Sequence, residues 1–96
     1  LLDQMDPDHL IADRLFRDHC VLSEGVFVKD LGLLGRDLNS VIMIDNAAQS
    51  FKFQPCNGIE CSPFINDPDD RELTAMIPFL EYLASKSVGE MRCFSF

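Results

Sequence analysis

The chain of 96 residues has no tryptophan, only two histidines, and only 8 Lys and Arg against 16 Asp and Glu. This shortage of positive charge argues against direct binding of nucleic acid, because duplex affinity depends on several basic side chains that neutralise phosphates. The formal charge of −8 favours a basic peptide or a cation as a partner instead. No apolar run approaches the roughly 18 residues that cross a bilayer, so we expect no membrane span.

The chain also lacks a regular cysteine pattern. Cys20, Cys56, Cys61 and Cys93 are spaced too irregularly to define a disulfide framework. Structural zinc is disfavoured as well, because Cys56 and Cys61 have no second close pair of ligands. We therefore expect free thiols, which are typical of a reducing compartment such as the cytosol or the nucleus.

The length bounds the chain to one small globular domain. A domain of this size buries a small core, unless another part of a longer protein completes it. The sequence opens on Leu1 without an initiator Met and already in an amphipathic pattern. We expect it to come from the middle of a longer polypeptide.

The first half of the chain alternates short elements. Residues 1–5 read as the end of a helix, and the Pro in residues 6–8 predicts a turn. The β-branched and aromatic residues that flank Gly25 predict two short strands that return on each other as a hairpin, over residues 14–22 and 26–31. A helical turn that packs through Leu31 and Leu34 is expected next.

The second half contains the most distinct elements. Residues 41–44 form a continuous apolar run, which is typical of a strand buried on both faces in a parallel sheet. A further strand is expected at 59–61. Apolar residues at helical spacing then predict a helix, whose N-cap and acidic first turn come from residues 67–70 and which Pro78 could kink or break. The sequence therefore predicts an α/β fold.

Polar residues follow two of the predicted strands. Lys29 ends one, and Asp45 and Asn46 end the apolar strand, where open α/β sheets place their ligands. Carboxylate and amide oxygens suit Mg²⁺, and a lysine nearby could offset the charge on a phosphoryl group. Taken alone, these residues are more typical of a surface lysine and of a turn or helix cap than of a metal site, and Arg17 could be a solvated strand residue.

Several segments in order along the chain resemble a known family. They are Arg14-Leu-Phe-Arg17, His19-Cys-Val21, Phe27-Val-Lys-Asp-Leu31, Leu34-Gly-Arg-Asp-Leu38, Val41-Ile-Met-Ile-Asp-Asn46, Phe53-Gln-Pro55 with Asn57-Gly58, and Leu73 through Glu81. Together they resemble the FCP/SCP-type phosphatases, the C-terminal-domain phosphatases and NLI-interacting-factor-like proteins of the haloacid dehalogenase superfamily.

The resemblance implies that residues 1–96 are the C-terminal part of one phosphatase domain. Its fold would be Rossmann-like, with a mostly parallel central sheet flanked by helices. The activity implied is Mg²⁺-dependent hydrolysis of phosphoserine or phosphothreonine through an aspartyl-phosphate intermediate. The substrate would be a phosphorylated peptide such as the tail of RNA polymerase II, which points to the nucleus or the cytoplasm.

The resemblance also assigns roles to individual residues. Lys29 matches the lysine that orients the nucleophile and offsets phosphoryl charge. Asp45 and Asn46 match a motif in which the Asn binds Mg²⁺ and the Asp supports the waters of the metal. Arg17 matches an arginine beside the substrate peptide. Residues 47–48 are alanines, where members of the family often carry Ser-Pro.

Two motifs of the family are missing from these 96 residues. The chain contains no Asp-x-Asp-x-Thr, which supplies the nucleophile, and no recognisable Ser or Thr of the second motif. We therefore expect these residues alone not to catalyse. The resemblance leaves a second function open, a phosphatase-like binding subunit without activity, as in the mitochondrial presequence translocase.

Overall fold

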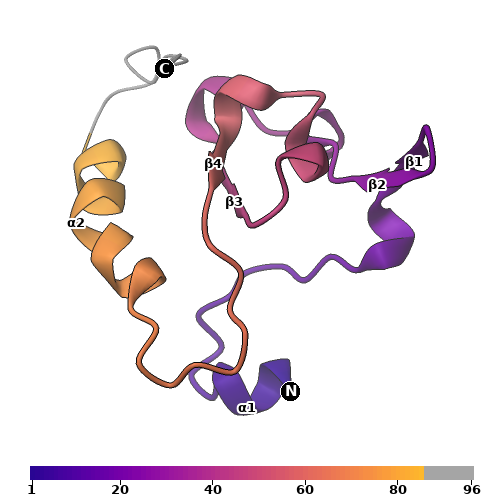
Figure 1. Cartoon of the computed structure of the whole chain (residues 1–96). Coiled ribbons are helices and arrows are strands. Elements are labelled where there is room, and N and C mark those ends of the chain that lie inside the picture. The colour runs from indigo at the N-terminus through magenta and orange to yellow at the C-terminus, as the bar shows by residue number, and fades with distance from the viewer. Residues whose placement is uncertain (86–96) are drawn as a thin grey trace.

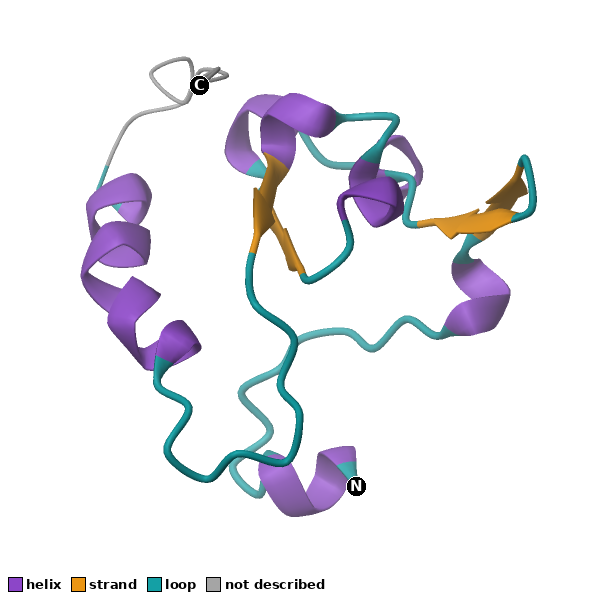
Figure 2. Ribbon diagram, viewed as in Figure 1, coloured by secondary structure: helices purple, strands orange, loops and turns teal. Residues whose placement is uncertain are grey.

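The structure is a computed structural model, and it describes residues 1–85. It has an α/β composition, in which short elements alternate along the chain (Figures 1 and 2). The helices are α1 (Leu2–Met5) and α2 (Glu72–Ala84), and the strands are β1 (Val21–Ser23), β2 (Val26–Val28), β3 (Met43–Asp45) and β4 (Gly58–Glu60). Short 3₁₀ segments lie between them along the chain.

The predicted hairpin is confirmed. Strands β1 and β2 pair antiparallel, with Leu22 opposite Phe27. Glu24 and Gly25 at its tip both have positive φ, 52° and 79°, which is the backbone of a tight two-residue turn. The first strand is shorter than expected, because residues 17–19 form a 3₁₀ turn that His19 closes by accepting a hydrogen bond from the Phe16 N–H at 2.8 Å.

The second sheet is a parallel pair. Strand β3 pairs with β4 so that Asp45 lies opposite Glu60. The described residues thus form two separate two-stranded sheets, one antiparallel and one parallel, rather than one mostly parallel sheet. Met43 and Ile44 are half-buried and not buried on both faces. Strand β4 is the one strand that pairs with β3 in the described chain.

The core lies between the two sheets and is small. Its buried hydrophobic side chains in the described chain are Val28, Leu31 and Phe51. Leu31 begins the expected helical turn, Leu31–Leu34, and Asp30 caps it by accepting a hydrogen bond from the Gly32 N–H. Gly58 is required by close packing, because a Cβ at this position would lie 2.0 Å from the Phe51 ring.

Helix α2 begins later than its sequence predicts. Residues 67–70 form a turn, in which Asp69 N–H donates to the Asp67 carboxylate. Asp70 then accepts a hydrogen bond from the Glu72 N–H and so caps the helix from two residues upstream. The helix continues past Pro78 to Ala84 without a break. None of its side chains is fully buried, and in Figure 1 it lies on the side of the β3–β4 pair opposite the hairpin.

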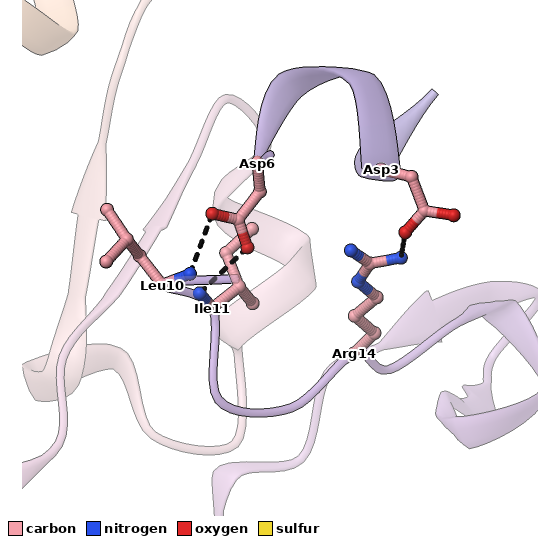
Figure 3. Close-up of polar contacts among 5 residues, drawn as sticks. All are labelled: Asp3, Asp6, Leu10, Ile11 and Arg14. Atoms are coloured by element: carbon pink, nitrogen blue, oxygen red, sulfur yellow. Dashed lines mark hydrogen bonds and ion pairs between the residues drawn. The ribbon is translucent and has the colours of Figure 1, made fainter. Parts of the chain in front are cut away.

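The loop that follows α1 is held by one buried carboxylate, that of Asp6. Asp6 ends α1 and accepts hydrogen bonds from the backbone N–H groups of Leu10 and Ile11, at 2.7 and 3.0 Å (Figure 3). These bonds hold the predicted turn after α1 closed, and the chain continues from there to the 3₁₀ turn at residue 17. Arg14 adds an exposed ion pair with Asp3 at 2.9 Å.

The cysteines differ in part from the expectation of free thiols. Cys20 and Cys61 are free, whereas Cys56 is disulfide-bonded. The expectation was wrong for Cys56 because pairing depends on proximity in three dimensions, which spacing along the chain does not reveal. Cys93 lies outside the described residues. Within residues 1–85, no helix is both long enough and apolar enough to span a membrane.

Candidate functional site

Lys29 and Asp45 meet between the two sheets. Lys29 directly follows β2, and its backbone N–H donates to the carbonyl of Ser50 at 2.7 Å. This bond ties the end of β2 to the loop after β3. The ammonium group of Lys29 donates a hydrogen bond to Oδ2 of Asp45, the last residue of β3. The structure thus brings together two residues that the sequence singled out separately.

The Asp45 carboxylate is fixed at both oxygens. Its side chain is 7% exposed. While Oδ2 binds Lys29, Oδ1 accepts a hydrogen bond from the Ala47 N–H at 2.9 Å. Burial raises the pKa of Asp45, but the Lys29 hydrogen bond, the Ala47 N–H, the Lys29 charge and the Ser50 side chain outweigh it, so the pKa lies below its ordinary value. Asp45 is therefore a carboxylate at neutral pH.

Asn46 follows Asp45 directly, and its side chain is not engaged by the described residues. It lies in the bend after β3 and is exposed. Its side-chain amide makes no hydrogen bond to any residue in the part of the chain that the structure describes. An amide oxygen in this position is available to a hard cation such as Mg²⁺. Both oxygens of Asp45 already have partners, so Asp45 fits a role through metal-bound water better than direct coordination.

Arg17 and Lys29 line one pocket. This pocket has a volume of about 510 Å³. Arg17 begins the 3₁₀ turn after the loop that Asp6 folds, and its guanidinium carbon lies 5.1 Å from the centre of the Phe27 ring. The pocket is lined by Leu15, Phe16, Arg17, His19, Cys20, Phe27, Lys29, Asp30, Leu31, Leu34, Met43 and Ser50. It combines an apolar wall with two cations and one carboxylate, that of Asp30, whose Oδ1 accepts hydrogen bonds from the Gly32 N–H and the Gln54 amide. The excess of positive charge suits an anionic group carried on a partly apolar ligand.

The structure does not bring all the predicted residues to this pocket. Asp45 and Asn46 are not among its lining residues, and Asp45 contributes through Lys29. Among residues 1–85, no three His, Cys, Asp or Glu side chains gather in a way that could hold a metal ion. The residues described here can thus supply Asn46 as one ligand of a metal site and Asp45 beside it, but no complete set.

Sequence reasoning missed two residues of the site. Ser50 lines the pocket, accepts the Lys29 N–H and lowers the pKa of Asp45, and no motif marks it. Phe27 stacks on Arg17, and the period of two along a strand could have placed it on the same face as Lys29. At position 47 the contact to Asp45 comes from the backbone N–H of Ala47 and not from its side chain.

Comparisons with known proteins add to this geometry. The chain is 48% identical over 85 residues to "CTD small phosphatase-like protein 2" of Dictyostelium discoideum, which covers 88% of the chain and 15% of that protein. It is 45% identical over 93 residues to "Mitochondrial import inner membrane translocase subunit TIM50" of Kluyveromyces lactis, which covers 96% of the chain and 19% of that protein.

A third relative is "CTD small phosphatase-like protein 1" of Caenorhabditis elegans, 42% identical over 81 residues, or 84% of the chain and 16% of that protein. The chain thus spans less than a fifth of the length of each of these three relatives. The sequence pattern of the NLI interacting factor-like phosphatases matches residues 1–92. With nearly its whole length matched, the chain belongs to the NLI interacting factor-like phosphatase family.

Proposed function

We propose that the whole protein is a Mg²⁺-dependent protein serine/threonine phosphatase with a haloacid dehalogenase fold, and that residues 1–96 are the C-terminal part of its catalytic domain. The observation that carries the proposal is the Lys29–Asp45 pair beside a pocket that also holds Arg17. Two cations at one pocket suit a phosphoryl group, whose charge must be offset during its transfer. The parallel β3–β4 pair is consistent with the fold.

Each residue has a defined task in this proposal. Asp45 stays ionised and holds the Lys29 ammonium in place. Lysine has three N–H donors, so Lys29 can bind Asp45 and still donate to a phosphoryl oxygen. Its side chain is 49% exposed and therefore accessible to a substrate. Arg17, which also lines the pocket, binds the phosphorylated peptide.

The nucleophile of the proposed reaction comes from outside these residues. A carboxylate attacks phosphorus, the bond to the serine or threonine oxygen breaks, and that oxygen takes a proton from an acid that also lies outside these residues. Water then hydrolyses the aspartyl-phosphate, which releases inorganic phosphate and restores the carboxylate. Mg²⁺, when bound, neutralises phosphoryl charge, and Asn46 would be one of its ligands. We propose a phosphorylated protein such as the C-terminal domain of RNA polymerase II as the substrate, and the nucleus or the cytoplasm as the location.

A hydrolysis assay on the full-length protein tests this proposal. The substrates are p-nitrophenyl phosphate and a phosphoserine peptide, with Mg²⁺ or with EDTA. We expect activity that EDTA abolishes and that Lys29→Ala lowers by about 10²- to 10³-fold, since it removes a charge aimed at the transferring group. Lys52→Ala is the matched control, because Lys52 contacts Glu24 and Phe53 and does not line the pocket. Equal losses in the two variants would contradict the role of Lys29.

A second function, a binding subunit without activity, is supported by the similarity to the translocase subunit of Kluyveromyces lactis. Under this proposal the protein resides in mitochondria and assists protein import. The same assay separates the two functions. A folded full-length protein that hydrolyses neither substrate and fractionates with mitochondria would favour the binding subunit.

A further inference from the structure

The positions of the two cations of the pocket, Lys29 and Arg17, depend on the short strand β2. Residues two apart in an extended chain share a face, so Phe27 in β2 and Lys29 directly after it point to one side while Val28 points to the other. The surroundings agree with this alternation. Phe27 and Lys29 line the pocket, whereas Val28 between them is fully buried in the core.

Phe27 is the partner that the described residues offer to the Arg17 guanidinium. The guanidinium carbon lies 5.1 Å from the ring centre, within the range of a cation–π contact. Arg17 is exposed and has no ion pair with an acidic side chain among residues 1–85. A long side chain without such a partner would sample many rotamers, and stacking on a flat ring limits them.

The backbone that carries Phe27 is held in place. Its strand is anchored on one side by the buried Val28 and at its end by the hydrogen bond from Lys29 N–H to Ser50. Across the hairpin, Leu22 lies directly opposite Phe27. Stacking also leaves the N–H groups at the rim of the guanidinium free to donate to an anion in the pocket.

We propose that Phe27 is a positioning residue that holds Arg17 for the phosphoryl group of a phosphopeptide. This inference rests on the proposed function of the pocket and adds to it a residue that touches no reacting atom. Strand β2 then sets the spacing of both cations, Lys29 directly and Arg17 through the aromatic ring. The role requires an aromatic ring and not merely an apolar side chain.

Binding of a peptide with a phosphonate analogue of phosphoserine to the full-length protein tests this role without turnover. Phe27→Leu should weaken binding about two- to fivefold, the size expected for an exposed cation–π contact. Phe27→Tyr should keep wild-type affinity, because it retains the ring. In an Arg17→Ala background, Phe27→Leu should have no further effect, since the stacked group is gone.

Phe53→Leu is the matched control. Phe53 and Phe27 are both 43% exposed, and Phe53 lies outside the pocket, so its substitution should leave affinity unchanged. The inference is overturned if Phe27→Leu binds as wild type does, if its loss persists in the Arg17→Ala background, or if the wild type does not bind the peptide at all.

Parallel kinetics with the phosphoserine peptide separate this inference from the proposed function. We expect Phe27→Leu to raise KM with little change in kcat, because the contact positions a binding group. If the wild type hydrolyses the peptide, but Phe27→Leu has the same effect with and without Arg17, only the inference about Phe27 is refuted. If the wild type does not hydrolyse the peptide, but Phe27→Leu weakens phosphonate binding only when Arg17 is present, only the catalytic proposal is refuted.

Discussion

Lys29 and Asp45 form an ion pair in which the two partners differ sharply in exposure. The Asp45 side chain is 7% exposed and the Lys29 side chain 49%. The carboxylate is thus a fixed part of the interior, while the ammonium group can reach a ligand. This asymmetry makes Asp45 a support for Lys29 rather than a group that itself meets the substrate.

Asp45→Asn should destabilise the protein. It keeps the shape of the side chain but removes the charge that accepts the Lys29 hydrogen bond, which is worth roughly 1–3 kcal/mol for a charged group. Urea unfolding of the full-length protein and the variant measures this loss. Glu24→Gln is the control, because its partner Lys52 is 3.9 Å away and Glu24 is 90% exposed, so little change is expected. Equal losses in the two variants would contradict a special role of Asp45.

The contribution of Asp45 should depend on pH in one direction. Its pKa is lowered by folding, so the stability it adds is fully present above the unfolded pKa of about 3.9 and is lost as pH falls through the lower folded pKa. The difference in unfolding free energy between wild type and Asp45→Asn should be constant near neutral pH and shrink in acid. Urea unfolding at a series of pH values tests this. A difference that grows in acid would refute the pKa shift.

Gly58→Ala should destabilise the β3–β4 pair by roughly 1–3 kcal/mol or more, because the added Cβ overlaps the Phe51 ring. Thermal unfolding measures the effect. Gly25→Ala is a useful comparison, since no atom lies within 4 Å of its added Cβ and only the backbone at φ 79° is strained. Adding Phe51→Leu to Gly58→Ala should recover part of the loss. No recovery would mean that the ring is not the obstacle.

Asp6→Ala should loosen the loop after α1. It leaves two backbone N–H groups without their acceptor, at a cost of roughly 1–3 kcal/mol, and Asp6→Asn should cost less because the amide oxygen can still accept one of them. Hydrogen exchange of the Leu10 and Ile11 amides reports the change directly. Asp3→Ala removes only an exposed ion pair and should leave those amides protected. If the Leu10 and Ile11 amides exchange at the same rate in Asp6→Ala as in the wild type, Asp6 does not hold this loop.

Local patterns predicted the elements that local interactions hold. The alternation around Gly25 predicted the hairpin, and the leucines at 31 and 34 predicted a helical turn. The apolar run followed by Asp45 placed the site at a strand end. The residue roles at Lys29, Asp45, Asn46 and Arg17 came from family resemblance, and they remain predictions.

Features that depend on distant contacts could not be predicted. The need for Gly58 comes from the Phe51 ring, and the stacking of Arg17 comes from Phe27 on another element. The start of α2 was misplaced because Asp67 and Asp70 look alike in sequence, while only Asp70 reaches the first helical N–H. The sequence predicts only a turn at Asp6, and its burial follows from the path of the loop it holds.

The fixation of Asp45 has a thermodynamic consequence for ligand binding. Both carboxylate oxygens have partners, and its carbonyl accepts a hydrogen bond from the Cys61 N–H at 3.0 Å. Asp45 is therefore ordered before a ligand arrives, so its side chain loses little rotamer freedom on binding. A ligand that contacts the exposed Asn46 must order this side chain, which costs conformational entropy. A ligand that contacts only Lys29 does not order Asn46 and avoids this cost.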